Sequence, residues 1–285
     1  MNSFKRILAA GLALALTGAL AGAAPAFAQS APLPEAIRAA GALRVGIEAT
    51  YPPMAYKDPA TNERRGVNVD LVTAIGRDLG VEIRWEEMSF EQIINSLTTG
   101  RIDFSGTSMT DLPARREKLT FVDYITTGGQ LFTTRALAAS IREATDFCGR
   151  SVSTPRFTNY FPSGQAWSEK ACVAAGKPPM QVVGSNGATA SRTDLRQERT
   201  QGAILGAEFV AHLQRTEPEN WAAVGKPITD NLSGLAFPKD ATTLRDAIAA
   251  SLQRLIDNGT YGEILKKHGI AAQAISRVSV DAGQP

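Results

Sequence analysis

The stretch Gly66–Tyr124, which opens with GVNVDLVTAIGRDLG and closes with GTSMTDLPARREKLTFVDY, decides the fold of this chain. Apolar residues recur at three- and four-residue spacing from Asn68 to Leu79, which predicts a helix that stops at Gly80. The alternation of apolar and polar residues from Val81 to Trp85 then predicts a half-buried strand. Helices and strands that alternate in this way are typical of an α/β protein with parallel sheets.

The same order of elements continues to the end of this stretch. Ser89 and Gln92 have the spacing of a capping box, which predicts a second helix that ends at Gly100. Another strand begins at Ile102, and we expect it to run out at Gly106 and to give way to a polar loop.

A second α/β unit is expected from about Arg135 onward. Its predicted elements are strands at 151–153 and 180–183, a helical run over 160–175 that is broken near Pro162, and a helix at 195–199. Apolar residues spaced along one face predict a long amphipathic helix over 244–256, ended by Gly259. We expect the polar tail, 271–285, to be frayed.

The first 28 residues have the anatomy of a secretory signal peptide. Lys5 and Arg6 precede an apolar run rich in Ala and Leu, and Ala26-Phe27-Ala28 is an A-x-A cleavage site. A retained membrane anchor is the alternative, but the run is shorter than the about 20 apolar residues that a spanning helix needs. The sequence therefore predicts a chain that is exported and cleaved.

Charge and length limit the kind of partner. Loss of Lys5 and Arg6 changes the formal net charge from +2 to about 0, so nothing favours nucleic acid or a membrane surface as a partner. About 257 residues would remain, which favours two lobes over a single core. We therefore expect a small-molecule partner.

Cys148 and Cys172 are the two cysteines of the chain. In an oxidising compartment, two such residues in one region suggest a disulfide, which would stabilise the fold by roughly 3 kcal/mol. Two buried free thiols are the alternative.

Motifs of catalysis and of cofactor binding are absent from the sequence. It has no H-E-x-x-H, no G-x-S-x-G, no G-x-x-x-x-G-K-[ST], and no G-x-G-x-x-G that opens a helix. His212 and His268 are far apart and near expected helix ends, which favours surface positions over metal ligation. We expect no catalytic residues, no metal and no cofactor.

The expected loop 107–116 favours an anion. It carries three hydroxyl residues, then Asp111 as a helix cap, Pro113 as the first helical residue and Arg115 in the first turn. Free N–H groups at a helix start, hydroxyls and a guanidinium together suit a carboxylate. An ordinary capped surface turn is the alternative.

The order of elements and several longer phrases resemble the family 3 extracellular solute-binding proteins, the periplasmic receptors of importers for polar amino acids and related solutes. The phrases are GIEATYPPMAY, GVNVDLVTAIGRDLG, W-x-x-x-S-F-E-Q-I-I-N-S-L-x-x-G-x-I-D, LTFVDYITTGG and SGLAFPKDATTLRDAIAASLQRLIDNGTYGEILKKHG. The resemblance is looser from Phe147 to Gly225. Taken together these phrases are specific for the superfamily, but none identifies a ligand.

The resemblance implies roles for residues of the expected loop. Arg115 matches the residue that clamps the ligand's α-carboxylate, and Thr110 matches the hydroxyl residue that helps it. Ser108 matches the residue whose backbone carbonyl meets the α-ammonium group.

Three residues near strand and helix ends match the positions that hold the ligand side chain. Tyr51 and Phe90 match the aromatic pair that sandwiches it, and Glu48 matches an acid that can meet a basic group. Both aromatics lie at the carboxyl edge of the expected sheet, where open α/β folds bind ligands. Core or surface packing is the alternative for them.

The second half of the chain departs from the family pattern. Thr158 and Asn159 match the anion-binding loop, although Phe157 replaces a glycine there, and a simple turn or helix cap is the alternative. The acid that grips the α-ammonium should fall near Gly206, so Glu208 is the candidate substitute; a solvated helix face is its alternative. Without such an acid, the ligand would be a carboxylate that lacks an α-amino group.

The resemblance implies a type II periplasmic binding protein fold, in which two α/β lobes are joined by a two-segment hinge. Signal peptide 1–28 would be followed by lobe 1 at 29–127, lobe 2 at 128–231, and the rest of lobe 1 with the tail at 232–285. The implied protein is a monomeric periplasmic receptor that binds an amino acid or related small carboxylate and serves the membrane permease of an ABC importer.

Two alternatives share this fold. One is a periplasmic enzyme of the cyclohexadienyl dehydratase type, which would need a well-placed acid such as Glu48 or Glu208. The other is a sensor domain.

Overall fold

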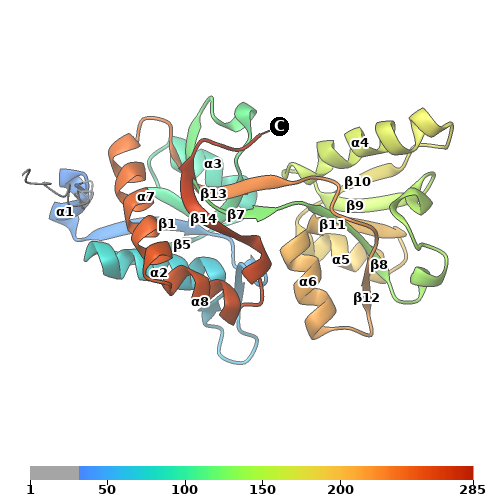
Figure 1. Cartoon of the computed structure of the whole chain (residues 1–285), viewed down its shortest axis with the longest axis horizontal. Coiled ribbons are helices and arrows are strands. Elements are labelled where there is room, and N and C mark those ends of the chain that lie inside the picture. Colours follow the sequence, from blue (N-terminus) through green and yellow to red (C-terminus); the bar gives the residue numbers. More distant parts are fainter. Residues whose placement is uncertain (1–31, 285) are drawn as a thin grey trace, which may run out of the picture.

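The computed structural model describes residues 32–284 and places them in two lobes, each built on its own sheet (Figure 1). We call the lobe with the six-stranded sheet lobe 1 and the lobe with the five-stranded sheet lobe 2. The predicted signal peptide lies outside the described residues. The expected α/β class with two lobes is confirmed.

The sheet of lobe 1 has the strand order β14-β7-β13-β6-β1-β5. Its strands, in chain order, are β1 (Ala42–Ile47), β5 (Glu82–Glu87), β6 (Phe104–Thr110), β7 (Leu119–Thr127), β13 (Asn231–Pro238) and β14 (Ala274–Val280). β1 is parallel to β5 and β6, whereas β13 is antiparallel to both β6 and β7. The expectation of parallel sheets is therefore only partly right, because the chain leaves the lobe on β7 and returns on β13 in the opposite direction.

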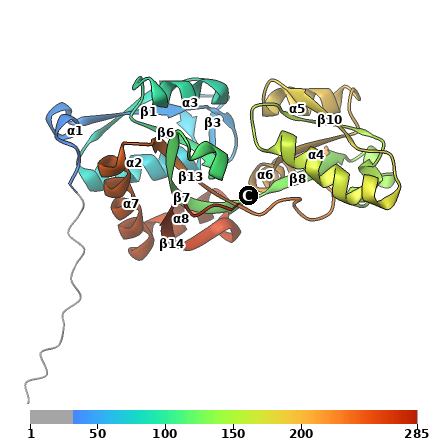
Figure 2. The same ribbon diagram turned by 90° about the horizontal axis from the view of Figure 1, so that it is seen from above.

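Helices cover both faces of this sheet (Figure 2). They are α1 (Glu35–Ala40), α2 (Val67–Leu79), α3 (Phe90–Thr98), α7 (Thr242–Asp257) and α8 (Thr260–Lys267). Helices α2, α7 and α8 share one apolar core cluster, and α3 packs a second cluster on the other face. A small sheet of β2 (Thr50–Tyr51), β3 (Ala55–Lys57) and β4 (Arg64–Arg65) flanks the lobe.

The sequence signals for α2 and α3 act as predicted. Gly80 ends α2 with φ 68°, a left-handed conformation that favours glycine. Ser89 and Gln92 form the expected capping box before α3.

Lobe 2 has the strand order β10-β9-β11-β8-β12. Its strands are β8 (Gly129–Thr134), β9 (Ser151–Pro155), β10 (Gln181–Ser185), β11 (Gly202–Gly206) and β12 (Trp221–Ala223), and its helices are α4 (Tyr160–Ala171), α5 (Ala188–Arg196) and α6 (Ala207–Thr216). The expected break near Pro162 is wrong. Pro162 is the third residue of α4, where a missing N–H costs no intrahelical bond.

The expectation of a frayed tail is also wrong. β14 forms the edge of the lobe 1 sheet beside β7. Beyond it, Asp281 accepts hydrogen bonds from the Thr120 hydroxyl and the Phe121 N–H, both at 2.8 Å. These bonds, and not apolar burial, hold the last residues, so hydropathy gave no sign of them.

The chain passes between the lobes twice, once from β7 to β8 and once from β12 to β13 (Figure 1). Thr127 and Asn231, at the lobe 1 ends of these connections, are paired across β7 and β13. The two segments are therefore neighbours. The boundaries at 127–128 and 231–232 stay predictions.

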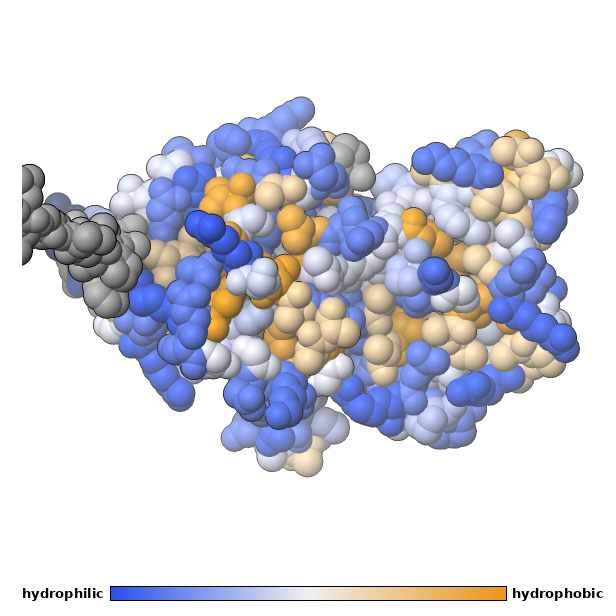
Figure 3. All heavy atoms as spheres, in the orientation of Figure 1, coloured by the Kyte–Doolittle hydropathy of each residue, from blue (hydrophilic) through white to orange (hydrophobic). Residues whose placement is uncertain are grey.

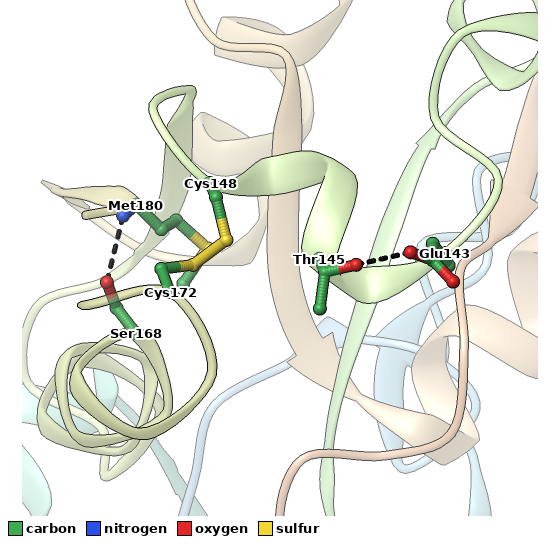
Figure 4. Close-up of a disulfide and its surroundings, with 6 residues drawn as sticks. All are labelled: Glu143, Thr145, Cys148, Ser168, Cys172 and Met180. Atoms are coloured by element: carbon green, nitrogen blue, oxygen red, sulfur yellow. Dashed lines mark hydrogen bonds between the residues drawn. A yellow bond between two sulfur atoms is a disulfide. The ribbon is translucent and has the colours of Figure 1, made fainter. Parts of the chain in front are cut away.

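Cys148 and Cys172 form a disulfide (Figure 4). It ties the C-terminal end of α4 to the segment before β9, near the hydrogen bond from the Met180 N–H to the Ser168 hydroxyl at 2.8 Å. The loop with Thr158 precedes the other end of α4, and a helix of 12 residues spans about 18 Å, so the bridge does not hold that loop.

In the view of Figure 3, hydrophilic residues cover the outer rims of both lobes, while apolar residues gather nearer the middle of each. Within residues 32–284, no helix combines the length and the apolar character that a membrane crossing needs.

Replacement of both cysteines by alanine is expected to lower the free energy of unfolding by roughly 3 kcal/mol, because the bridge closes a loop with a sequence separation of 24. Urea denaturation measures this, and reduced wild-type protein should match the variant. Mass spectrometry of the unreduced wild type should show one linked peptide pair. Free thiols in the purified protein would contradict the assignment.

Candidate functional site

A cavity of about 330 Å³ lies between the two lobes, and side chains of both lobes line it. We call it the cleft cavity. Eight of the nine residues predicted for the site line it, namely Glu48, Tyr51, Phe90, Ser108, Thr110, Thr158, Asn159 and Glu208. The structure thus brings together residues that are up to 160 positions apart in sequence.

Glu48 follows the carboxyl end of β1, where it enters the cavity wall. Its N–H donates to the Thr107 hydroxyl at 2.8 Å, which fixes the backbone. Burial raises the pKa of Glu48, and hydrogen bonds from Thr50 and from the Phe90 backbone only partly oppose this. A buried carboxylate of this kind is stabilised when a cation enters beside it.

The hydroxyl residues lie on strand β6 and not on a loop. We expected the strand to end at Gly106, but it continues to Thr110. A Cβ at Gly106 would lie 2.7 Å from a Val45 side-chain atom, so the glycine serves close packing and does not mark a turn. β13 pairs with β6 at Ser105, Met109 and Thr110, with an irregularity between these positions.

Ser108 and Thr110 have different partners. The Ser108 hydroxyl is hydrogen-bonded to the Tyr124 hydroxyl and donates to Asn68 Oδ1 at 3.2 Å. The Thr110 hydroxyl donates across the cleft to Asn159 Oδ1 at 3.1 Å. The role expected for the Ser108 carbonyl stays a prediction.

The segment after β6 forms a single 3-10 turn, Pro113–Arg115, and Asp111 does not cap it. Instead, Asp111 accepts two hydrogen bonds from the Arg116 guanidinium, at 2.6 and 2.7 Å. The expectation of a helix capped by Asp111 is therefore wrong, because a charged partner five residues on outcompetes the backbone N–H groups.

Arg115 is the one predicted residue that is not part of the cavity lining, although it touches two residues that are. Its guanidinium donates to the Thr110 carbonyl at 2.8 Å and lies 5.9 Å from the centre of the Phe90 ring. Burial lowers the pKa of Arg115 to about 10. Since Asp111 is already paired with Arg116, an anion in the cavity would be the natural partner of Arg115.

In lobe 2, three helices begin at the cavity: α4 after Asn159, α5 after Gly187 and α6 after Gly206. Their free N–H groups give this wall a positive potential. The Thr158 hydroxyl is used in the turn, where it donates to the Pro155 carbonyl at 2.8 Å.

Glu208 is a buried residue of the first turn of α6, and not part of a solvated helix face. Its carboxylate accepts a hydrogen bond from the Thr127 hydroxyl, and burial raises its pKa. A Cβ at Gly206 would lie 2.0 Å from a carboxylate oxygen of Glu208. The carboxylate therefore occupies the space that a side chain at position 206 would need.

Sequence reasoning missed several lining residues, among them Asn68, Thr127 and Tyr160. Tyr160 is the first residue of α4 and is buried. Its place directly after Asn159, at a helix start already assigned to the site, was a signal that could have identified it. Asn68 and Thr127 had no such signal, because they lie on a helix and a strand that read as core.

The histidines take no part in this site. His268 Nε2 lies 2.7 Å from an Asp70 oxygen, and His212 is half-buried on α6. In the described part of the chain, no group of His, Cys, Asp and Glu residues is arranged to hold a metal ion.

Comparison with known proteins gives consistent matches. Residues 43–271 match the model of the bacterial extracellular solute-binding proteins, family 3. The chain is 29% identical over 238 residues to the arginine-binding protein ArgT of Corynebacterium glutamicum, covering 84% of this chain and 77% of that protein. It is 26% identical over 265 residues to the L-arginine-binding protein of Pseudomonas aeruginosa. That match covers 90% of this chain and 95% of that protein. Among solved structures, an ancestral arginine-binding protein bound to arginine matches with a TM-score of 0.69 at 26% identity. That match covers 80% of this chain and 98% of the ancestral protein.

Arg116→Ala is expected to lower the free energy of unfolding by roughly 3–5 kcal/mol, because it leaves a buried carboxylate without its partner. The Asp111 side chain is 0% exposed. Arg84→Ala is the control, since it breaks a pair with Glu82 in which the side chains are 58% and 63% exposed; it should cost less than about 1 kcal/mol. Urea denaturation measures both, and equal small losses would contradict a structural role for Arg116.

Proposed function

This chain belongs to the bacterial extracellular solute-binding proteins of family 3, and we propose that it is the substrate-binding receptor of an ABC importer for a basic amino acid. The observation that carries the proposal is the combination of charges around one small cavity. Glu48 and Glu208 line it from different lobes, and the Arg115 guanidinium lies just behind its wall.

The charges match the three ionic groups of such a ligand. Arg115 would bind the α-carboxylate together with Thr110, whose carbonyl already orients the guanidinium. Glu208 would accept the α-ammonium group, and Glu48 would meet the cationic side chain. Glu208 is buried, Glu48 and Arg115 are half-buried, and desolvation shifts the pKa of each, so each gains from an oppositely charged partner.

The relatives support the choice of a cationic ligand. Two of them are named as arginine-binding proteins, and the matched ancestral structure holds arginine. A cavity of about 330 Å³ is at the small end of the range for ligand sites. Tyr51 and Phe90 would flank the ligand side chain, since a planar guanidinium stacks well on aromatic rings.

The location and partners follow from the same proposal. Residues 1–28 would direct export and be removed, and the mature monomer would work in the periplasm. Ligand contacts from both lobes would stabilise the closed form through a hinge at the β7–β8 and β12–β13 connections. The membrane permease of the importer would then recognise that closed form.

Arg115→Ala should leave folding nearly intact and weaken arginine binding by roughly 2–4 kcal/mol, as for one partner of a buried charge pair. Isothermal titration calorimetry with arginine measures this, and Arg84→Ala, on the exposed face of β5, is the matched control. Retention of wild-type affinity in Arg115→Ala would show that the carboxylate binds elsewhere. Arg116→Ala is unsuitable as a control because Arg116 holds the buried Asp111.

Glu208→Gln should weaken arginine by roughly 2 kcal/mol, because the α-ammonium loses a charged acceptor. The arginine analogue that lacks the α-amino group should bind wild type and Glu208→Gln almost equally. Calorimetry of the two ligands with both proteins tests this. If the analogue binds wild type as well as arginine does, and the substitution changes neither, the protein is not a receptor for α-amino acids.

A further inference from the structure

We propose that Tyr51 fastens the two lobes to each other before any ligand arrives, so that the unliganded receptor is already largely closed. This inference extends the proposed receptor function, but it concerns the empty protein and can be tested without a ligand. It assigns to Tyr51 a positioning role beyond the ligand-flanking role expected from the sequence.

Tyr51 belongs to lobe 1 but is bonded to lobe 2. It lies on β2 and packs against the lobe 1 core cluster, and it packs equally against the lobe 2 cluster that contains Phe209. The ring centres of Tyr51 and Phe209 are 4.5 Å apart. The Tyr51 hydroxyl accepts a hydrogen bond of 2.7 Å from the Gly206 N–H.

Two further side-chain bonds join the lobes beside this contact. The Thr127 hydroxyl, at the end of β7, donates to the Glu208 carboxylate, and the Thr110 hydroxyl donates to Asn159. These bonds are buried, so water competes poorly for them. A separate contact, from Arg215 to the His268 carbonyl at 3.1 Å, is exposed and contributes less.

Gly206 makes this arrangement possible. Its N–H faces the Tyr51 hydroxyl, and the space above its Cα holds the Glu208 carboxylate. A side chain at position 206 would displace that carboxylate. The glycine therefore allows one point of lobe 2 to be held by Tyr51 and, through Glu208, by Thr127.

Opening the cleft would expose the Tyr51 and Phe209 rings together and exchange two buried hydrogen bonds and one part-buried hydrogen bond for bonds to water. Ligand binding shifts an open–closed equilibrium only by its differential affinity for the two states. Protein contacts that bridge the lobes shift the same equilibrium without a ligand. A receptor of this kind gains affinity because less of the binding energy is used for closure.

Small-angle X-ray scattering of the unliganded proteins tests this inference. Tyr51→Phe keeps the ring but removes the oxygen, and loss of the hydrogen bond from the Gly206 N–H should shift the open-to-closed ratio by about fivefold toward the open form. The radius of gyration of Tyr51→Phe should therefore exceed that of wild type. Thr127→Val, which removes the bond to Glu208, should change it in the same direction.

Tyr261→Phe is the matched control. Its hydroxyl donates to the Tyr124 carbonyl at 2.6 Å and accepts from the Ile275 N–H at 3.0 Å, so both bonds lie within lobe 1. It should lower the melting temperature without changing the radius of gyration. If all four proteins have the same radius of gyration, or if Tyr261→Phe expands as much as Tyr51→Phe, the inference is wrong.

Stopped-flow binding of arginine gives a second readout. Arginine should associate faster with Tyr51→Phe than with wild type, because less of the variant has to open first. Addition of arginine should compact the variant more than wild type, and equal compaction of the two would overturn the inference. A wild type that does not bind arginine would instead contradict the proposed function and leave the comparison of the unliganded proteins valid.

Discussion

The antiparallel pairing of β7 with β13 is the constraint on which the rest of the molecule depends. The two strands pair from Leu119 opposite Pro238 to Thr127 opposite Asn231, with one shift of register between Ser233 and Gly234. Because one strand leaves lobe 1 and the other re-enters it beside the first, both connections lie at one edge of the cleft. The same pairing places β13 against β6, where it meets Ser105, Met109 and Thr110. Thr110 is thereby held in the lobe 1 wall of the cleft cavity.

Two neighbouring arginines acquire opposite roles from one buried aspartate. Asp111 accepts two hydrogen bonds from the Arg116 guanidinium, which also donates to the Gly283 carbonyl, so Arg116 is a structural residue. Arg115 is left with a backbone carbonyl and an aromatic ring as neighbours, and its pKa falls because burial outweighs the opposing charge effects of Tyr160 and Asp111. Their common residue type gave no hint of this difference; it depends on where a 3-10 turn directs each side chain. The unmatched charge is the one beside the cavity.

The sequence predicted those parts of the fold whose signals are local. Amphipathic spacing and glycine stops located α2, α3 and α7, and the capping box at Ser89 is present. The predictions of strand ends and of the tail were wrong where residues distant in sequence determine the local structure. Gly106 was interpreted as a strand end, because its packing partners Val45 and Trp85 are invisible in a local window. The tail was expected to be frayed, because its anchoring bonds are made by Thr120 and Phe121.

Sequence reasoning predicted residues of the cavity lining in both lobes, and the one predicted residue outside the lining, Arg115, belongs to lobe 1. Glu208 is buried in the space that a side chain at position 206 would fill. Only the folded structure shows this relation between the two residues. The same holds for Tyr51, whose ring was assigned to a ligand but whose hydroxyl binds lobe 2. The remaining site assignments stay predictions until a bound complex tests them.

The edge strand β14 sets an order of assembly. Lobe 2 is built from consecutive strands and helices between Gly129 and Ala223, whereas lobe 1 needs β1 from the start of the chain and β14 from its end. When the chain becomes available from its N-terminal side, lobe 2 can complete its sheet before β14 joins lobe 1. Gly283 also donates to the buried Asp111 at 2.8 Å. The segment after β14 would thus close the shell around the aspartate that holds Arg116 only after lobe 2 has formed.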